Sequence, residues 1–195
     1  MKLYFATHNA HKLDEARAIL GDAIDLQSLN ALDIWGELPE TGHTLHDNAL
    51  QKARFLVRHY GVNCFADDTG LEVDALGGEP GVYSARYAGE PANSERNRQK
   101  LLERLRGIDN RRARFRTVVA LIIDGEEMTF EGTVEGKIID TERGESGFGY
   151  DRLFMPDGTN KTFAQMTADE KNAISHRARA MMQMKEYLRK VRNWE

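Results

Sequence analysis

The strongest constraint on the fold is a change in the pattern of apolar residues along the chain. Short apolar runs alternate with helical patterns at first, and two long strand-like segments follow later. Lys2 to Ala6 is a short apolar run typical of a buried strand, and a helical pattern begins at Lys12. Ala113 to Asp124 and Glu127 to Asp140 are strand-like and joined by a tight hairpin signal. This order predicts an α/β fold with a mixed sheet.

Capping and stop signals place the other elements. Thr44 can cap a helix that Gly61 ends, and a capping box at Thr167 starts a last helical segment. The remaining predicted elements are a strand at Leu26 to Leu29, a buried strand at Cys64 to Ala66, and a helix from Asn93 or Ser94 to near Gly107.

Length and charge exclude several classes of protein. A chain of 195 residues suits one domain, 1–195, with or without two lobes. The longest apolar stretch, Val118 to Ile123, is too short to span a membrane, and the N-terminus does not resemble a signal peptide. One cysteine forms no internal disulfide, so we expect a cytoplasmic protein with no membrane partner. The net charge of −4 argues against a nucleic-acid partner, and Arg111 to Arg116 indicates a solvated loop and strand face.

The first candidate site is the polar loop from Ala6 to Lys12. A strand end that leads into a helix start exposes backbone N–H groups and the positive end of a helix dipole. Thr7 and Asn9 add neutral donors and Lys12 adds a cation, a combination that suits a polyphosphate. An ordinary α/β loop is the alternative, because the spacing is not that of a Walker loop.

The second candidate site is a pair of carboxylates, Asp67 and Asp68, that directly follows an apolar run. Carboxylates at a strand end need water or cations, and Mg²⁺ beside a phosphate meets that need. Neighbouring carboxylates also raise each other's pKa, which can make one of them a base. Glu40 could be a further ligand. A solvated turn is the alternative.

Helix residues after Glu40 offer further polar groups. Asn48, Lys52 and Arg54 could approach phosphate or cap other elements, although a solvated helix face is the simpler interpretation of Arg54.

The third candidate site is the turn from Ser146 to Asp151. Its two glycines allow a sharp bend around Phe148, which could stack on a base, while Asp151 could accept a hydrogen bond from a ring N–H. The alternative is a turn with Phe148 packed in the core.

A fourth set of donors follows in the last helical segment. Lys171, His176 and Arg177 would not share one face of a continuous helix. If all three serve one site, the helix should break near Ser175.

Taken in order, these stretches resemble the inosine triphosphate pyrophosphatase family, the XTP/dITP diphosphatases, over essentially the whole chain. The residues that carry the resemblance are Thr7 to Lys12, Glu40-Thr41-Gly42, Asn48-Ala49, Ala66 to Gly70, Pro80 to Tyr87, Gly147 to Asp151 and Ser175-His176-Arg177.

The resemblance implies a single two-lobed domain with a long mixed twisted sheet, flanking helices and a central cleft. It implies a Mg²⁺-dependent homodimer that hydrolyses purine nucleoside triphosphates such as ITP, dITP and XTP to the monophosphate and pyrophosphate. By match, Glu40 and Asp68 bind metal, and Asp68 and Lys12 are catalytic. The implied substrate-binding residues are Thr7, His8, Asn9, Ala10, His11, Lys12, Thr69, Phe148, Gly149, Tyr150, Asp151, Lys171, His176 and Arg177.

The chain departs from the family pattern at two positions. His8 stands where a small residue is usual, and Thr69 stands where Ser is common. Histidine tolerates positive φ better than most residues, so the loop can be kept. Three rival functions are a pyrophosphatase for modified pyrimidine nucleotides, a nucleotide-binding regulator without turnover, and an RNA-binding module that uses the arginine run.

Overall fold

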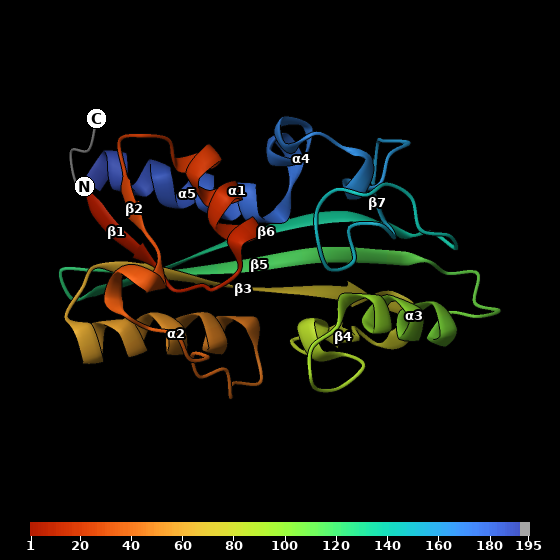
Figure 1. Cartoon of the computed structure of the whole chain (residues 1–195). Coiled ribbons are helices and arrows are strands. Elements are labelled where there is room, and N and C mark those ends of the chain that lie inside the picture. The colour runs from red at the N-terminus through yellow and green to blue at the C-terminus, as the bar shows by residue number, and fades with distance from the viewer. Residues whose placement is uncertain (192–195) are drawn as a thin grey trace. The chain divides into compact units, whose positions relative to one another are not determined.

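The computed structural model describes residues 1–191 and has the mixed α/β arrangement expected (Figure 1). The α-helices are α1 (Ala10–Leu20), α2 (Leu45–Tyr60), α3 (Ser94–Arg104), α4 (Ala168–Ile174) and α5 (His176–Val191). The strands are β1 (Lys2–Phe5), β2 (Asp25–Gln27), β3 (Cys64–Val73), β4 (Pro80–Gly81), β5 (Arg112–Ile123), β6 (Glu126–Ile138) and β7 (Phe154–Pro156).

The sheet is mixed, as the sequence predicts. Its strand order is β2-β1-β3-β5-β6-β7, and β4 pairs with β3. β1 is parallel to β2 and β3, whereas β4 is antiparallel to β3 and β7 is antiparallel to β6. Asp124 and Gly125, between β5 and β6, have φ angles of 50° and 82°, which a two-residue hairpin turn requires.

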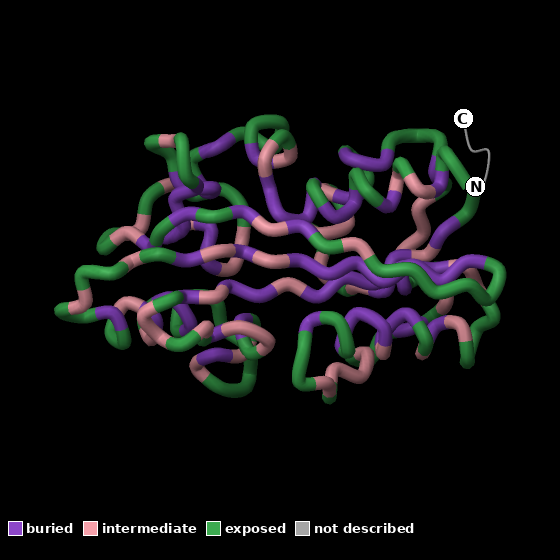
Figure 2. The backbone as a smooth tube through the Cα atoms, turned by 180° about the vertical axis from the view of Figure 1, so that it is seen from behind, coloured by how far each residue is buried: buried purple, intermediate pink, exposed green. Residues whose placement is uncertain are grey.

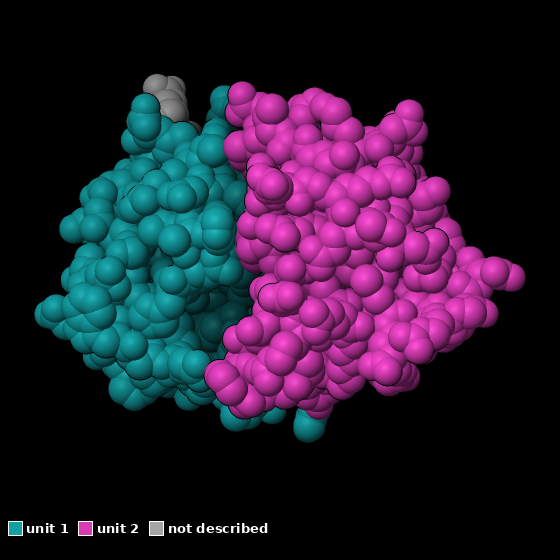
Figure 3. Space-filling view, turned by 45° about the vertical axis from the view of Figure 1, so that its right-hand side comes forward, with its two compact units in different colours: residues 1–68, 117–132, 177–195 teal, residues 69–116, 133–176 magenta. Residues whose placement is uncertain are grey.

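The chain divides into two compact units, which Figure 3 colours separately. The first unit consists of residues 1–68, 117–132 and those from 177 onward, and the second consists of residues 69–116 and 133–176. The prediction of a single domain with a central cleft stays a prediction. None of the helices in residues 1–191 is long and apolar enough to cross a membrane.

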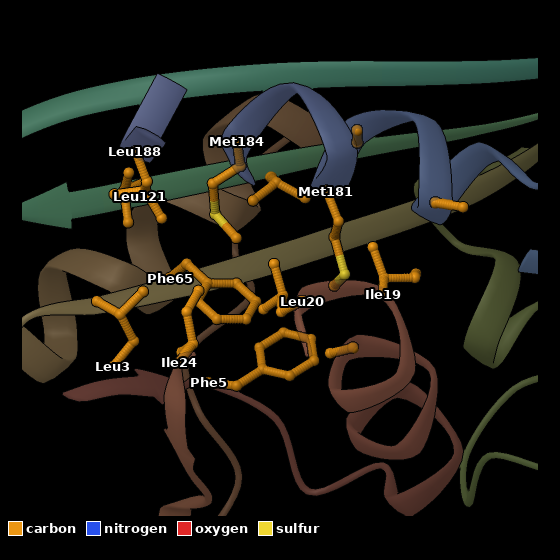
Figure 4. Packing of buried hydrophobic residues seen from close by; sticks show 14 of the residues in the cluster. Leu3, Phe5, Ile19, Leu20, Ile24, Phe65, Leu121, Met181, Met184 and Leu188 are labelled. Atoms are coloured by element: carbon orange, nitrogen blue, oxygen red, sulfur yellow. The ribbon is translucent and has the colours of Figure 1, made fainter. Parts of the chain in front are cut away.

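The core of the first unit lies between the sheet and two helices. In Figure 1, α1 and α5 lie on one side of the strands and α2 lies on the other. Phe5 of β1 stacks on Phe65 of β3, with ring centroids 4.4 Å apart. The cluster drawn in Figure 4 also includes Leu20 of α1, Leu121 of β5 and Met184 of α5. Met181 and Met184 of α5 are therefore core residues, whereas Met182 between them is exposed.

Cys64 lies fully buried in the first unit. Its thiol donates to the carbonyl of Ala53 on α2, and the Sγ–O distance is 3.3 Å. Burial raises the pKa of this thiol to about 12.

The second unit has a separate core. Leu71 and Val73 of β3, Leu101 of α3 and Phe154 of β7 belong to one buried cluster there. Phe115 of β5 packs edge-on against Phe154, with ring centroids 4.7 Å apart.

One strand, β5, shows how the two units differ. Residues 117–123, in the first unit, are all buried, since helices cover both faces of the sheet (Figure 2). Residues 112–116, in the second unit, alternate: Ala113 and Phe115 are buried, and Arg112, Arg114 and Arg116 are exposed or half-buried. The arginine run is thus the polar face of a strand, as predicted.

Several predicted boundaries are confirmed. Thr44 caps α2 by accepting from the N–H of Asp47, and Gly61 ends that helix with φ of 63°. The predicted break near Ser175 is present, because α4 ends at Ile174 and α5 begins at His176.

Two predicted strands need correction. The strand that starts at Cys64 does not end at Ala66 but continues to Val73, because the buried Leu71 and Val73 extend the strand pattern. The expected strand at Leu26 to Leu29 covers only Asp25–Gln27, and a 3₁₀ turn, η1, takes Leu29–Leu32.

Candidate functional site

The phosphate-loop candidate is held by its own side chains. Asn9 caps α1, and its Oδ1 accepts from the amides of His11 and Lys12 at 3.0 and 3.3 Å. The Thr7 hydroxyl accepts from the amide of Asn9 at 3.1 Å. Three amides that were expected to face phosphate are therefore bonded within the loop, which fixes its conformation. Ala10 is exposed as the first helical residue.

His8 extends this loop sideways. Its side chain is exposed, and its Nε2 lies 2.8 Å from the carbonyl oxygen of Gly36. His8 is not among the positive-φ residues of the described chain, which outside glycine are Asp33 and Asp124. The backbone at position 8 therefore does not require a small residue, and histidine fits there without strain.

Behind the loop lies a set of ionisable side chains that we call the charged cluster: Lys12, Glu15, Glu40, Lys52, Asp67, Asp68 and Arg177. Asp67 is at its centre and has no exposed surface. Lys12 Nζ donates to one of its carboxylate oxygens at 2.9 Å, and Arg177 Nε donates to the other at 3.0 Å. Arg177 also bonds Glu15 through Nη1.

Asp68 faces a different set of partners. Its Oδ2 accepts from Nδ2 of Asn48, a buried residue of α2, at 3.1 Å. Lys52, also on α2 and buried, donates to the Asp67 carbonyl at 2.7 Å and bonds Glu40. Asn48 Oδ1 accepts from the amide of Gly42 at 2.8 Å, which ties the Glu40 loop to α2.

The pKa values of the two neighbouring aspartates are therefore shifted in opposite directions. Burial would raise the pKa of Asp67, but Lys12 and Arg177 hold it below its ordinary value. Burial raises the pKa of Asp68, and nearby Glu40 adds to this, against the opposing effect of Lys52. Asp67 is a fixed anion, whereas Asp68 is the carboxyl group that holds a proton more readily than an ordinary aspartate.

The two lysines also differ. Burial lowers the pKa of Lys12, and its one strong partner, Asp67, does not fully offset that effect. Burial also acts on Lys52, but Asp68, Glu40 and Asp67 together raise its pKa.

A divalent cation fits the donors around Lys52. Glu40 and Asp68 both surround this one ammonium, and Asp68 is held in a state that favours protonation. Mg²⁺ in proteins commonly uses one or two carboxylates and completes its shell with water and substrate phosphates. Among residues 1–191, no group of three or more histidine, cysteine and carboxylate side chains could hold a metal by itself. The chemistry thus fits Mg²⁺ shared with a phosphate rather than an all-protein cage.

The base-binding candidate lies in the second unit, at the turn Ser146 to Asp151. Phe148 is half-buried, so it is not a core residue. Asp151 Oδ2 accepts from the amide of Phe148 at 3.0 Å and from Lys171 Nζ at 2.8 Å. That ammonium lies 4.9 Å from the Phe148 ring centroid, within the range of a cation–π contact.

Tyr150 and His176 complete this region as buried supports. Tyr150 donates its hydroxyl to the carbonyl of Ser84 at 2.7 Å, and burial raises the pKa of the phenol. The His176 ring stacks on Phe115 with centroids 4.6 Å apart. Gly149 bends the chain with φ of 60°.

The predicted site residues therefore fall into two groups. Thr7 to Lys12, Glu40, Asp68 and Arg177 belong to the first unit; Thr69, Phe148 to Asp151, Lys171 and His176 belong to the second. Arg177 was predicted to read the base, yet its guanidinium is 1 % exposed and is bonded to Asp67 and Glu15. Its base-reading role stays a prediction, and in this structure it positions Asp67.

Sequence reasoning missed three members of the site or gave them no definite role. Glu15 was not singled out, although it lies one helical turn after Lys12 on α1. Asn48 and Lys52 lie four residues apart on one face of α2, a spacing that could have paired them. Arg54 is confirmed as a solvated residue, paired with Glu127.

The arginine run belongs to neither group of site residues. Its four side chains form ion pairs with acidic neighbours of the second unit, namely Arg111 with Asp140, Arg112 with Asp157, Arg114 with Glu135, and Arg116 with Glu72. A nucleic-acid surface needs cations that are available to phosphate, so this pairing argues against an RNA-binding module.

Comparison with known proteins gives one consistent family. A profile of the Ham1 family matches residues 3–187. A protein of Christiangramia forsetii named dITP/XTP pyrophosphatase is 49% identical over 190 residues, which cover 97% of this chain and 100% of that protein. A protein of the same name from Porphyromonas gingivalis is 51% identical over 188 residues, covering 96% and 97%. The solved structure of the Staphylococcus aureus Ham1 protein has a TM-score of 0.87 and 39% identity, covering 96% of this chain and 98% of that one.

Proposed function

Because the chain belongs to the Ham1 family, we propose that it is a dITP/XTP pyrophosphatase. It hydrolyses nonstandard purine nucleoside triphosphates to the monophosphate and pyrophosphate. We further propose that it requires Mg²⁺, acts as a homodimer and works in the cytoplasm. The match to proteins named dITP/XTP pyrophosphatase extends over nearly the whole of both chains, which supports the proposed hydrolysis.

The charged cluster is the observation that carries the proposal. Buried cations are costly unless carboxylates pair with them, and here Asp67 fixes Lys12 beside the phosphate loop. A ligand with several negative charges gains from such pre-positioned donors without reordering them. A protein that only bound nucleotides would not need the further carboxylates Glu40 and Asp68 next to these cations.

The residues around Lys52 would hold the metal. Glu40 and Asp68 would supply carboxylate oxygens, and Mg²⁺ would neutralise phosphate charge and polarise the phosphorus under attack. Lys52 would keep Glu40 and the Asp67 carbonyl in place through its two hydrogen bonds.

The reaction breaks the bond between the α-phosphorus and the oxygen that bridges it to the β-phosphorus. A water oxygen attacks the α-phosphorus, and pyrophosphate leaves with the bridging oxygen. Asp68 would orient this water and accept its proton, which its raised pKa favours. Lys12 would stabilise the charge that develops on the leaving pyrophosphate.

The second unit would select the base. Phe148 offers a ring for stacking, and Lys171 offers a donor to the 6-oxo group that hypoxanthine and xanthine carry. Adenine presents an amino group at that position, so a site made of donors rejects it. Guanine carries a 6-oxo group as well, so its rejection requires another contact.

The test is release of pyrophosphate from dITP, ITP, XTP, dGTP and dATP, each with Mg²⁺ and with EDTA. We expect turnover of the first three substrates only with Mg²⁺, and much slower turnover of the other two. Binding of dITP without pyrophosphate release would support a regulatory nucleotide-binding protein instead. Faster turnover of modified pyrimidine triphosphates would reassign the substrate class.

A further inference from the structure

The turn that carries Phe148 is held internally by close contacts. The Phe148 amide donates to Asp151 Oδ2, and a Cβ placed on Gly147 would lie 2.2 Å from that oxygen. Gly147 and Gly149 both have positive φ, at 75° and 60°. The turn therefore has little freedom within itself. Its position is set by contacts with the rest of the chain, including those made by its backbone carbonyl groups.

Arg98 of α3 holds the backbone carbonyl of Gly149 in this turn. Its Nη1 donates to the carbonyl oxygen of Gly149 at 2.9 Å, and its Nε donates to Glu142 at 2.6 Å. Arg98 is 8% exposed, and an arginine is seldom buried to this extent unless it is paired. A buried guanidinium needs partners in a fixed geometry, so α3, Gly149 and Glu142 are tied to one another.

The residue before Arg98 fixes α3 to the same region. Asn97 donates through Nδ2 to the carbonyls of Ser84 and Ala85, at 3.3 and 2.8 Å. Tyr150, next to Gly149, donates to the same Ser84 carbonyl. The turn and α3 are thus fastened to one shared backbone segment, and Arg98 is the charged link between them.

We propose that Arg98 is a positioning residue for base recognition, which places the Phe148 ring by holding the Gly149 carbonyl. The inference rests on the proposed function, because it takes Phe148 as the stacking surface for the purine. Arg98 itself contacts no reacting group. Its loss should therefore weaken binding of the base and leave the chemistry at the charged cluster unchanged.

The test compares Arg98→Met with the parent protein, with Arg104→Met as the matched control. Arg104 lies on the same helix and pairs with Glu79 at the surface. The readouts are kcat and KM for dITP, followed through dIMP formation, and the inhibition constant of pyrophosphate. Pyrophosphate carries no base, so it reports on the phosphate side alone.

We expect Arg98→Met to raise KM for dITP about tenfold, with kcat and the pyrophosphate inhibition constant within twofold of the parent. Arg104→Met should change none of the three. Arg98→Lys should recover part of the loss, because an ammonium can donate to Gly149 or to Glu142 but not to both in the same geometry. An unchanged KM in Arg98→Met would overturn the proposal, and so would a parallel rise in KM and the inhibition constant.

Glu142→Gln provides a second test if Arg98→Met does not fold. It keeps Arg98 and its bond to Gly149 but removes the charge that orients the guanidinium. We expect a rise in KM of about threefold and no change in pyrophosphate inhibition, and an unchanged KM would again contradict the proposal. Failure of the proposed function has a separate signature, since the parent itself would then release no pyrophosphate from dITP.

Discussion

The two units contain charged groups in contrasting surroundings. In the first unit, seven ionisable side chains lie together in the charged cluster, and its central carboxylate, Asp67, has two cationic partners. In the second unit, the ion pair of Lys171 with Asp151 is buried against the aromatic rings of Phe148 and Phe163.

The difference indicates what each unit can bind. A dense network of fixed opposite charges suits a ligand that is itself highly charged, such as a triphosphate with a cation. A single donor beside flat rings suits a planar, weakly polar ligand such as a purine. The predictions below test whether the two functions separate as the two environments do.

The largest effect is expected at Asp67. Asp67→Asn leaves Lys12 and Arg177 buried without their shared anion, which should lower the free energy of unfolding by about 3–5 kcal/mol. Urea unfolding at pH 7 measures this. The folded-state pKa of Asp67 is depressed, so its stabilisation is present above the ordinary value of 3.8 and lost as pH falls below it. The difference from the parent should therefore stay constant above about pH 4 and shrink as pH falls from about 4 toward 2, and a constant difference over that range would show that Asp67 is not held as an anion.

Asp68→Asn should have the opposite effect on stability and a large effect on rate. We expect dITP turnover to fall by a factor of a hundred or more, about 3 kcal/mol or above. The folded-state pKa of Asp68 is raised, so its ionisation destabilises the fold as pH rises through that pKa. In EDTA at pH 7 the variant should unfold at a higher temperature than the parent. Near-normal turnover would remove Asp68 from the mechanism.

Phe148→Ala tests the second unit directly. Loss of a stacked ring should raise KM for dITP by roughly ten- to a hundredfold, since base stacking on an aromatic residue is worth about 1–3 kcal/mol. Pyrophosphate inhibition should not change.

Lys12→Met is the counterpart from the first unit, and it should weaken pyrophosphate inhibition and dITP turnover together. If Phe148→Ala and Lys12→Met change KM for dITP and the inhibition constant of pyrophosphate by equal factors, the two environments do not act separately.

The smallest effect is expected on the polar face of β5. Arg114→Gln removes half-exposed ion pairs to Asp74 and Glu135, so the free energy of unfolding should fall by less than about 1 kcal/mol. The kinetic constants for dITP should stay within twofold of the parent. A large kinetic effect would mean that this face takes part in binding.

Much of the fold could be predicted from local signals. The cap at Thr44, the stop at Gly61 and the hairpin turn at Asp124 are decided by residues close in sequence, and all three are confirmed. The break before His176 could be predicted from geometry, because three donors on one helix could not share a face. The end of the strand from Cys64 could not, since two aspartates normally stop a strand pattern unless distant partners neutralise them.

The charged cluster was predicted less completely, for the same reason. Lys12, Glu40 and Asp68 could be nominated from sequence, but the pairing of Asp67 with Arg177 joins residues 110 positions apart. Only the folded chain decides which of two neighbouring aspartates receives the cations. Arg98 gave no signal, because its partners are Glu142, 44 positions away, and a backbone carbonyl, which any residue has.

The buried thiol of Cys64 has a practical consequence for testing these ideas. A thiol with a pKa of about 12 inside the core stays protonated at neutral pH, and the thiolate is the form that reacts with maleimides and iodoacetamides. A cysteine introduced at an exposed position, such as Arg104 on α3, can therefore carry a fluorescent or spin probe without removal of the native one. Motion of α3 when nucleotide binds then becomes measurable in the otherwise unaltered protein.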